Sequence, residues 1–265
     1  MKLRILTILA ALLALASLDA AAQRQHVRPG RPGHTGADAF RGIGITFGYV
    51  NSNYRTLELA TDEATTSAML HGFTLGLTKD FTLLPHALYF QTGVNYGYQN
   101  DPRNESYRIP YTDVSVRLVG DREEHYLGIP LRLKYDLHLL DRLGLTFDAG
   151  PTLFMGLSSK YKYKTKLTDN VLAVDYNLYN GKSDASGTSS IFDLENWMRM
   201  SGMYPEGRLG RFDVMLGASV GANFFHILEV RVGYDYGLLN RYRKDIADMY
   251  SMHRGQFTFS AGIRF

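Results

Sequence analysis

The feature that most constrains the fold of this chain is an alternation of apolar residues with small or polar ones. In residues 255–265 every second position is apolar from Phe257 onward, and the positions between are mainly Thr, Ser and Gly. Side chains of a β-strand alternate between two faces, so the pattern predicts a strand with one apolar face. Seven earlier stretches share it: residues 41–50, 72–78, 88–98, 127–136, 145–156, 212–224 and 228–237.

Eight alternating segments of about ten residues are typical of a transmembrane β-barrel. The predicted connections also alternate in length, because short ones follow the second, fourth and sixth segments and long ones follow the others. In such barrels the short turns are periplasmic and the long loops extracellular. The sequence therefore predicts an all-β protein, an eight-stranded antiparallel up-and-down transmembrane β-barrel. Its long extracellular loops are expected at residues 51–69, 100–124, 159–209 and 239–254.

A soluble barrel of the lipocalin type, which also has eight antiparallel strands, is the main alternative fold. Such a barrel would turn its apolar residues inward and place charged residues on its outer surface. Here the second face is dominated by Gly, Ser and Thr, which suit the crowded lumen of a narrow barrel. A helical membrane protein is excluded, because no apolar run reaches the ~20 residues that a helix needs to span a bilayer. These observations favour the membrane barrel.

The amino-terminal residues have the features of a secretory signal peptide. Lys2 and Arg4 precede an apolar segment at residues 5–18, and three alanines at residues 20–22 predict cleavage near Ala22–Gln23. We expect a signal peptide at residues 1–22, a flexible periplasmic lead-in at residues 23–40 and the barrel domain at residues 41–265. An uncleaved anchor helix is the alternative, but the apolar segment is too short for one.

Composition excludes several classes of function. The chain has no Cys, which rules out disulfides and a lipidated amino-terminal cysteine. Its formal net charge of +3 provides no basic surface of the kind that binds nucleic acid. His26 and His34 lie in the lead-in without supporting ligands, so we predict neither a metal site nor a cofactor.

The inward-facing positions of the predicted strands carry charged residues of both signs. Buried charges are tolerated when they are paired and hydrogen-bonded, so we expect a mutually neutralising network in the lumen. Its predicted members are Arg132, Lys134, Asp136, Asp148, Asp213, Glu229, Arg231, Asp235 and Arg264. Side chains just fill the interior of an eight-stranded barrel, which favours a structural plug. A gated ion path and a catalytic carboxylate pair are the alternatives.

Three histidines, His71, His125 and His253, are predicted near the extracellular rim, where outer-membrane enzymes place a nucleophile or base. A lipid A hydrolase or acyltransferase is therefore the alternative function from a different class. The sequence alone shows no Ser-His-acid arrangement, so we predict a protein that is not an enzyme and name no catalytic residue.

The longest predicted loop, residues 159–209, begins with alternating lysines and tyrosines. The strand is expected to continue beyond the membrane here, where its lysines are candidate contacts for lipopolysaccharide phosphates or simply solvated side chains. These lysines are Lys160, Lys162, Lys164 and Lys166. Further on, Ser190 and Gly202 bracket a predicted short helix that would lie across the barrel mouth or pack on a partner.

The closing stretch, which ends on Phe265, resembles the last strand of bacterial outer-membrane β-barrels. That resemblance implies that the barrel assembly machinery reads it as a signal. The residues that carry the resemblance are Phe257, Phe259, Ile263 and Phe265.

Three further stretches resemble the PorT-like outer-membrane β-barrel family of Gram-negative bacteria. They are YLGIPLRLKYDL at residues 126–137, AGPTLFMGL at residues 149–157 and RFDVMLGASVGANF at residues 211–224. The resemblance implies a location in the bacterial outer membrane and a structural or envelope-interaction role, with a link to protein secretion. We further expect contact with outer-membrane lipid, lipopolysaccharide and an envelope protein partner. A small channel is a third hypothesis for the function.

Overall fold

A computed structural model describes residues 42–61, 63–84, 87–108, 115–140, 142–167, 170–186, 208–225, 227–243 and 247–265. The predicted signal peptide, the lead-in and the helix expected at residues 190–202 lie outside the described residues. Within the described part of the chain, no helix is long and apolar enough to cross a membrane.

The described residues form ten strands. In chain order they are β1 (Ile43–Glu58), β2 (Glu63–Leu84), β3 (Leu88–Arg108), β4 (Ser115–Leu140), β5 (Leu143–Leu167), β6 (Asn170–Asn177), β7 (Lys182–Ser186), β8 (Phe212–Phe224), β9 (Leu228–Gly237) and β10 (Tyr250–Arg264).

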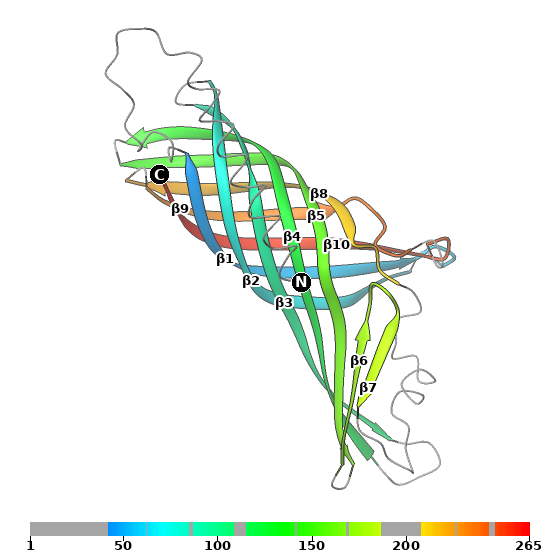
Figure 1. Cartoon of the computed structure of the whole chain (residues 1–265). Coiled ribbons are helices and arrows are strands. Elements are labelled where there is room, and N and C mark those ends of the chain that lie inside the picture. The colour runs from blue at the N-terminus through cyan, green and yellow to red at the C-terminus, as the bar shows by residue number, and fades with distance from the viewer. Residues whose placement is uncertain are drawn as a thin grey trace, which may run out of the picture. The chain divides into compact units, whose positions relative to one another are not determined.

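Eight of these strands close into a ring (Figure 1). The order around the ring is β1, β2, β3, β4, β5, β8, β9 and β10, with every neighbouring pair antiparallel. The first and last strands pair along their length, with Gly44 opposite Arg264 and Glu58 opposite Tyr250. The predicted eight-stranded up-and-down barrel is therefore confirmed, and β6 and β7 are additional strands outside the ring.

The two faces of the barrel wall differ as the alternation predicts. On β4, Leu133 is 54% exposed and the next residue, Lys134, is fully buried. On β10, Phe257, Phe259 and Ile263 are likewise exposed on the outside of the ring. A continuous belt of exposed aliphatic and aromatic side chains is the surface that a barrel presents to lipid.

The prediction of four long extracellular loops is wrong in part, because the strands continue far into those segments. Only residues 59–62 separate β1 from β2, and residues 109–114 separate β3 from β4. The sheet continues because, beyond the membrane, the inward-facing side chains become apolar, whereas within the membrane the outward-facing ones are apolar. Val50, Tyr54 and Leu70 point inward and are fully buried, so these parts of the strands pack like a sheet in water.

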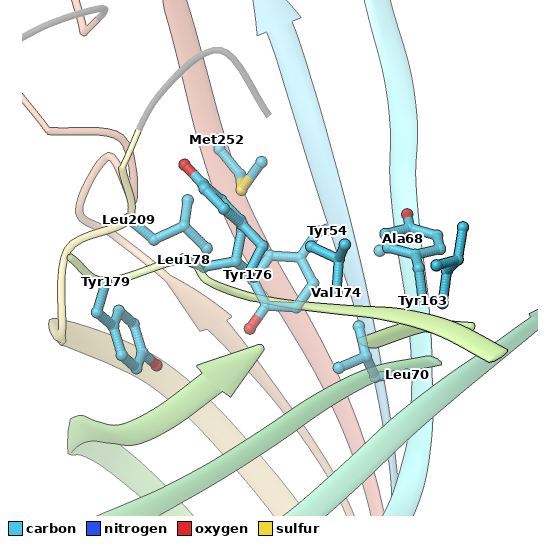
Figure 2. Packing of buried hydrophobic residues seen from close by; sticks show 11 residues of the cluster. Tyr54, Ala68, Leu70, Tyr163, Val174, Tyr176, Leu178, Tyr179, Leu209 and Met252 are labelled. Carbon is cyan, nitrogen blue, oxygen red and sulfur yellow. The ribbon is translucent and has the colours of Figure 1, made fainter. Parts of the chain in front are cut away.

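The inward side chains beyond the membrane form a hydrophobic cluster that we call the extracellular core (Figure 2). They come from β1, β2, β5, β6 and β10, from the turn after β6 and from the segment before β8. The cluster consists of Tyr54, Ala68, Leu70, Tyr163, Leu172, Val174, Tyr176, Leu178, Tyr179, Leu209 and Met252.

Strand β5 takes part in both regions. Its first part, from Leu143 to Met155, pairs with β8, whereas its last part, from Lys160 to Leu167, pairs with β6. Between them the pairing with β4 shifts by one residue at Leu157, which is a β-bulge. The bulge exchanges the two faces: Phe154 is buried below it, and Ser159 and Tyr163 are buried above it. The strand does continue beyond the membrane, as the sequence predicts.

Two lysine substitutions on β4 test where the membrane lies. Leu133 is at the middle of the lipid-facing part of β4, and Val119, 50% exposed, lies on the extracellular part of the same strand. We expect Leu133→Lys to lower the free energy of unfolding by about 2–4 kcal/mol and Val119→Lys by about 0–1 kcal/mol, because the cost of a lipid-facing charge depends on depth. Denaturant unfolding in lipid vesicles measures both, and equal losses would contradict the assigned membrane region.

Candidate functional site

Charged residues bridge the lumen from wall to wall in its periplasmic half. The guanidinium of Arg132 on β4 binds Asp148 on β5 at 2.8 Å and Asp235 on β9 across the barrel. The ammonium of Lys134 lies 3.2 Å from a carboxylate oxygen of Asp80 and 3.0 Å from one of Glu229.

Two more arginines connect these pairs into one network, which we call the lumen network. Arg231 donates to Glu229 and lies 3.3 Å from Asp148. Arg264 lies 2.9 Å from Asp80 and 2.7 Å from Asp136. All the predicted lumen residues except Asp213 therefore meet in one network, together with Asp80, which the sequence analysis left out.

Asp80 falls in the short connection predicted after residues 72–78 and so was not counted among the inward-facing residues, whereas β2 runs to Leu84. The signal was present in the sequence, since Asp80 continues the inward-facing series of Thr74 and Thr78. Asp213 lies apart at the opposite end of the lumen, where one of its carboxylate oxygens accepts a hydrogen bond of 3.1 Å from the backbone N–H of Leu239.

The lumen network has four cations and five carboxylates, and nearly all of them are buried. Adjoining it lies a cavity of about 100 Å³, lined by Thr, Ser, Asn and Gln side chains, by three residues of the network and by Tyr126, Phe154 and Met215. Such a cavity has room for a few water molecules. Among Asp80, Lys134, Glu229, Arg231 and Arg264 the paired charges leave a space of only about 10 Å³. A buried, hydrogen-bonded ion pair is costly to break.

A second buried polar group closes the lumen at its extracellular end, and we call it the mouth cluster. Its centre is Glu124 on β4, whose carboxylate lies 3.3 Å from both Arg241 and Arg254. The hydroxyl groups of Tyr54 and Tyr179 also donate to Glu124. Burial raises the pKa of Tyr179, so its phenol stays protonated and remains a donor.

Aromatic rings enclose the arginines of the mouth cluster. The guanidinium carbon of Arg254 lies 4.4 Å from the ring centre of Phe154 and 4.6 Å from that of Tyr126. Arg122 lies over the ring of Tyr54 at 4.5 Å. Sequence reasoning missed this cluster because it treated residues 100–124 and 239–254 as loops with no defined inward face.

The lysines at the start of the longest predicted loop face outward. Lys164 is exposed, Lys160 is half-buried, and Lys162 pairs with Glu123 on β4 at 2.5 Å. The side chain of Lys166 lies outside the described residues. Lys160, Lys162 and Lys164 thus form a row on the outer face of β5, above the bulge.

The three predicted rim histidines lie on three different strands and are not brought together. His71 hydrogen-bonds to the hydroxyl of Tyr49 at 2.6 Å, and His125 to that of Tyr96 at 2.7 Å. His253 lies 2.9 Å from the hydroxyl of Ser251. Among the described residues, no group of three His, Asp or Glu side chains is arranged to hold a metal ion.

Comparison with known proteins identifies the family. A family model described as the outer membrane protein β-barrel domain matches residues 8–265, almost the whole chain. The chain belongs to this family. It is an outer-membrane β-barrel protein, and its assignment to the PorT-like branch stays a prediction.

Several solved structures resemble this family member at low sequence identity. Ail, the attachment invasion locus protein of Yersinia pestis, is 15% identical with a TM-score of 0.37, and the match covers 85% of this chain and 99% of Ail. Neisserial surface protein A is 12% identical with a TM-score of 0.36, covering 84% and 97%. Likeness at this level supports no inference about function. No match is found among the curated proteins.

The lumen network can be tested with two neighbouring positions on β9. Arg231→Ala leaves Glu229 and Asp148 without one of their partners, so we expect a loss of about 3–5 kcal/mol of unfolding free energy. Val230→Ala, on the lipid side of the same strand, should cost less, because its side chain has no buried charge to leave unpaired. Heat-modifiability on gels and denaturant titration in micelles would compare the two. A similar loss in both variants would contradict the assignment of Arg231 to the lumen side and Val230 to the lipid side of β9.

Proposed function

We propose that this outer-membrane barrel is a closed anchor that holds an extracellular β-sheet in place for contact with another component of the envelope or cell surface. The extracellular sheet consists of β6, β7 and the parts of three barrel strands beyond the membrane: residues 101–108 of β3, 115–124 of β4 and 158–167 of β5. The observation that carries the proposal is this sheet, which is continuous with the barrel wall and packed on its own hydrophobic core.

The ion pairs that cross the lumen support an anchor rather than a channel. The lumen network crosses the periplasmic half, where it leaves a space of only about 10 Å³, and the mouth cluster crosses the extracellular end. The rim histidines support a protein that is not an enzyme. His253 lies 2.9 Å from the hydroxyl of Ser251, but its other ring nitrogen contacts the backbone carbonyl oxygen of Gly237 at 3.0 Å instead of the carboxylate of a triad.

Lipopolysaccharide is the first contact that we propose for the anchor. The row of Lys160, Lys162 and Lys164 faces outward just above the lipid-facing belt, at the level where phosphate groups of the outer leaflet would lie. The pairing of Lys162 with Glu123 leaves Lys160 and Lys164 as the main candidates. During biogenesis, the barrel assembly machinery would recognise the closing strand through Phe257, Phe259, Ile263 and Phe265.

An envelope protein is the second contact, and protein secretion is one setting for it through the resemblance to PorT-like barrels. The extracellular sheet continues beyond the lipid, and its β6–β7 turn, exposed at Asn180, lies beside the mouth cluster. Such a surface suits a protein that positions or recruits others, with no reaction of its own.

Photo-crosslinking on intact cells tests the proposed contact. A photo-reactive amino acid at Asn180 should give a discrete adduct with lipopolysaccharide or an envelope protein, because the turn is exposed on the extracellular sheet. Arg142, exposed in the short β4–β5 turn at the opposite end, is the matched control and should not give that adduct. Absence of an adduct at Asn180, or the same adduct from Arg142, would count against a role for the extracellular sheet.

A further inference from the structure

The extracellular parts of β2 and β3 separate from each other. Their pairing begins with His71 opposite Asn100 and continues toward the periplasmic end. Beyond this point, residues 63–70 of β2 pair with β1 alone among the described strands, and residues 101–108 of β3 pair with β4 alone. Strand β7 likewise pairs only with β6 within the described part of the chain. Residues 63–70 of β2, residues 101–108 of β3 and strand β7 therefore each have one edge with no strand partner among the described residues.

Two of these edges carry features that prevent another strand from adding. The open part of β3 has the sequence DPRNESYR, with a proline at its second position and four charged residues. Proline has no N–H to donate, and both proline and charge are known to protect strand edges. Strand β7 is only five residues long and includes Lys182 and Asp184.

The edge of β2 has no such protection. Residues 63–70 have the sequence EATTSAML, with no proline and with a single charge at the end next to the turn. The segment is eight residues long and includes two β-branched threonines, which favour extended structure. A long edge with a single charge and no proline is a template for strand addition.

We propose that an extended peptide segment of a partner protein adds as a strand to β2 along residues 63–70. This inference rests on the proposed contact function and adds a site on β2, next to the extracellular sheet. Backbone hydrogen bonds to the open edge would supply affinity, and alternate side chains of the peptide would supply specificity.

The neighbouring side chains define what the peptide must contain. Ala68 and Leu70 point into the extracellular core and are buried, whereas Met69 points outward and is 47% exposed. Inward positions of the added strand would extend the core, so they should be apolar or aromatic. Outward positions would face water, so they should be polar. The partner peptide should therefore alternate apolar and polar residues and contain no proline.

A second copy of this chain in the same membrane does not suit the edge. Copies related by rotation about the membrane normal hold their β2 strands in the same direction along that normal. Barrel strands tilt by about 35–45°, so the two strands would cross at roughly twice that angle and could not form a ladder. A peptide segment has no such restriction, because it can align with β2.

Hydrogen exchange of the full-length protein in micelles tests whether the edge is open. In a strand paired on one side, every second amide points away from its partner and exchanges quickly, so about half of the amides in residues 63–70 should be unprotected. Residues 119–124 of β4, which pair with both β3 and β5, are the control and should be protected throughout. Full protection of residues 63–70 without peptide would mean that the chain itself fills the edge, and it would overturn the proposal.

A labelled peptide with the sequence of residues 51–58, NSNYRTLE, serves as the probe. This segment already pairs with the other edge of β2. Tyr54 supplies an aromatic residue at an inward position, and Asn53 and Arg55 supply polar residues at outward positions. We expect saturable binding by fluorescence anisotropy, with new amide protection in residues 63–70. A peptide with proline in place of its tyrosine should not bind.

Two lysine variants locate the binding. Met69→Lys places a charge on the open edge and should weaken peptide binding at least tenfold, whereas Val119→Lys places the same charge at a similarly exposed site on a strand paired on both sides and should leave it unchanged. Heat-modifiability checks that both variants fold. No saturable binding, or equal binding by Met69→Lys, would overturn the inference. The proposed contact function fails separately, when crosslinking from Asn180 yields no adduct.

Discussion

The pairing of β1 with β10 is the interaction on which the rest of this structure depends. A bilayer offers no water to unpaired backbone N–H and C=O groups, so a sheet can span it only when its first and last strands meet. Fifteen residue pairs join the two strands, from Gly44 opposite Arg264 to Glu58 opposite Tyr250. Closing the ring sets the size of the lumen, and the size of the lumen determines what its side chains must do.

A narrow closed lumen brings charges from opposite walls within bonding distance. Lys134 on β4 reaches Asp80 on β2 and Glu229 on β9 because the barrel interior is only wide enough for side chains to meet. The need for a closed ring ends at the membrane surface, because water can hydrogen-bond to the backbone groups beyond it. There the strands leave the ring, reverse the polarity of their faces and form the extracellular core. One chain therefore combines a barrel built for lipid with a sheet built for water.

The sequence was sufficient to predict the barrel because the lipid-facing alternation is strict: Phe257, Phe259 and Ile263 on β10 lie outside as expected. It also predicted which charged residues line the lumen, since they share one phase of that alternation. It did not predict the mouth cluster. Glu124, Arg241 and Arg254 lie where the inward-facing side chains change from polar to apolar along the strands. On β5 a bulge at Leu157 also moves the inward-facing positions by one residue. Alternation with a period of two cannot be followed through such changes, so these segments resembled loops.

We propose that paired charges close the lumen and that the barrel serves as an anchor. Planar-bilayer recording with the purified protein tests this most directly. A lumen filled by the network and the mouth cluster predicts no conductance steps above the bare bilayer at moderate voltage. Reproducible single-channel steps from the folded protein would contradict the account and would favour a gated ion path.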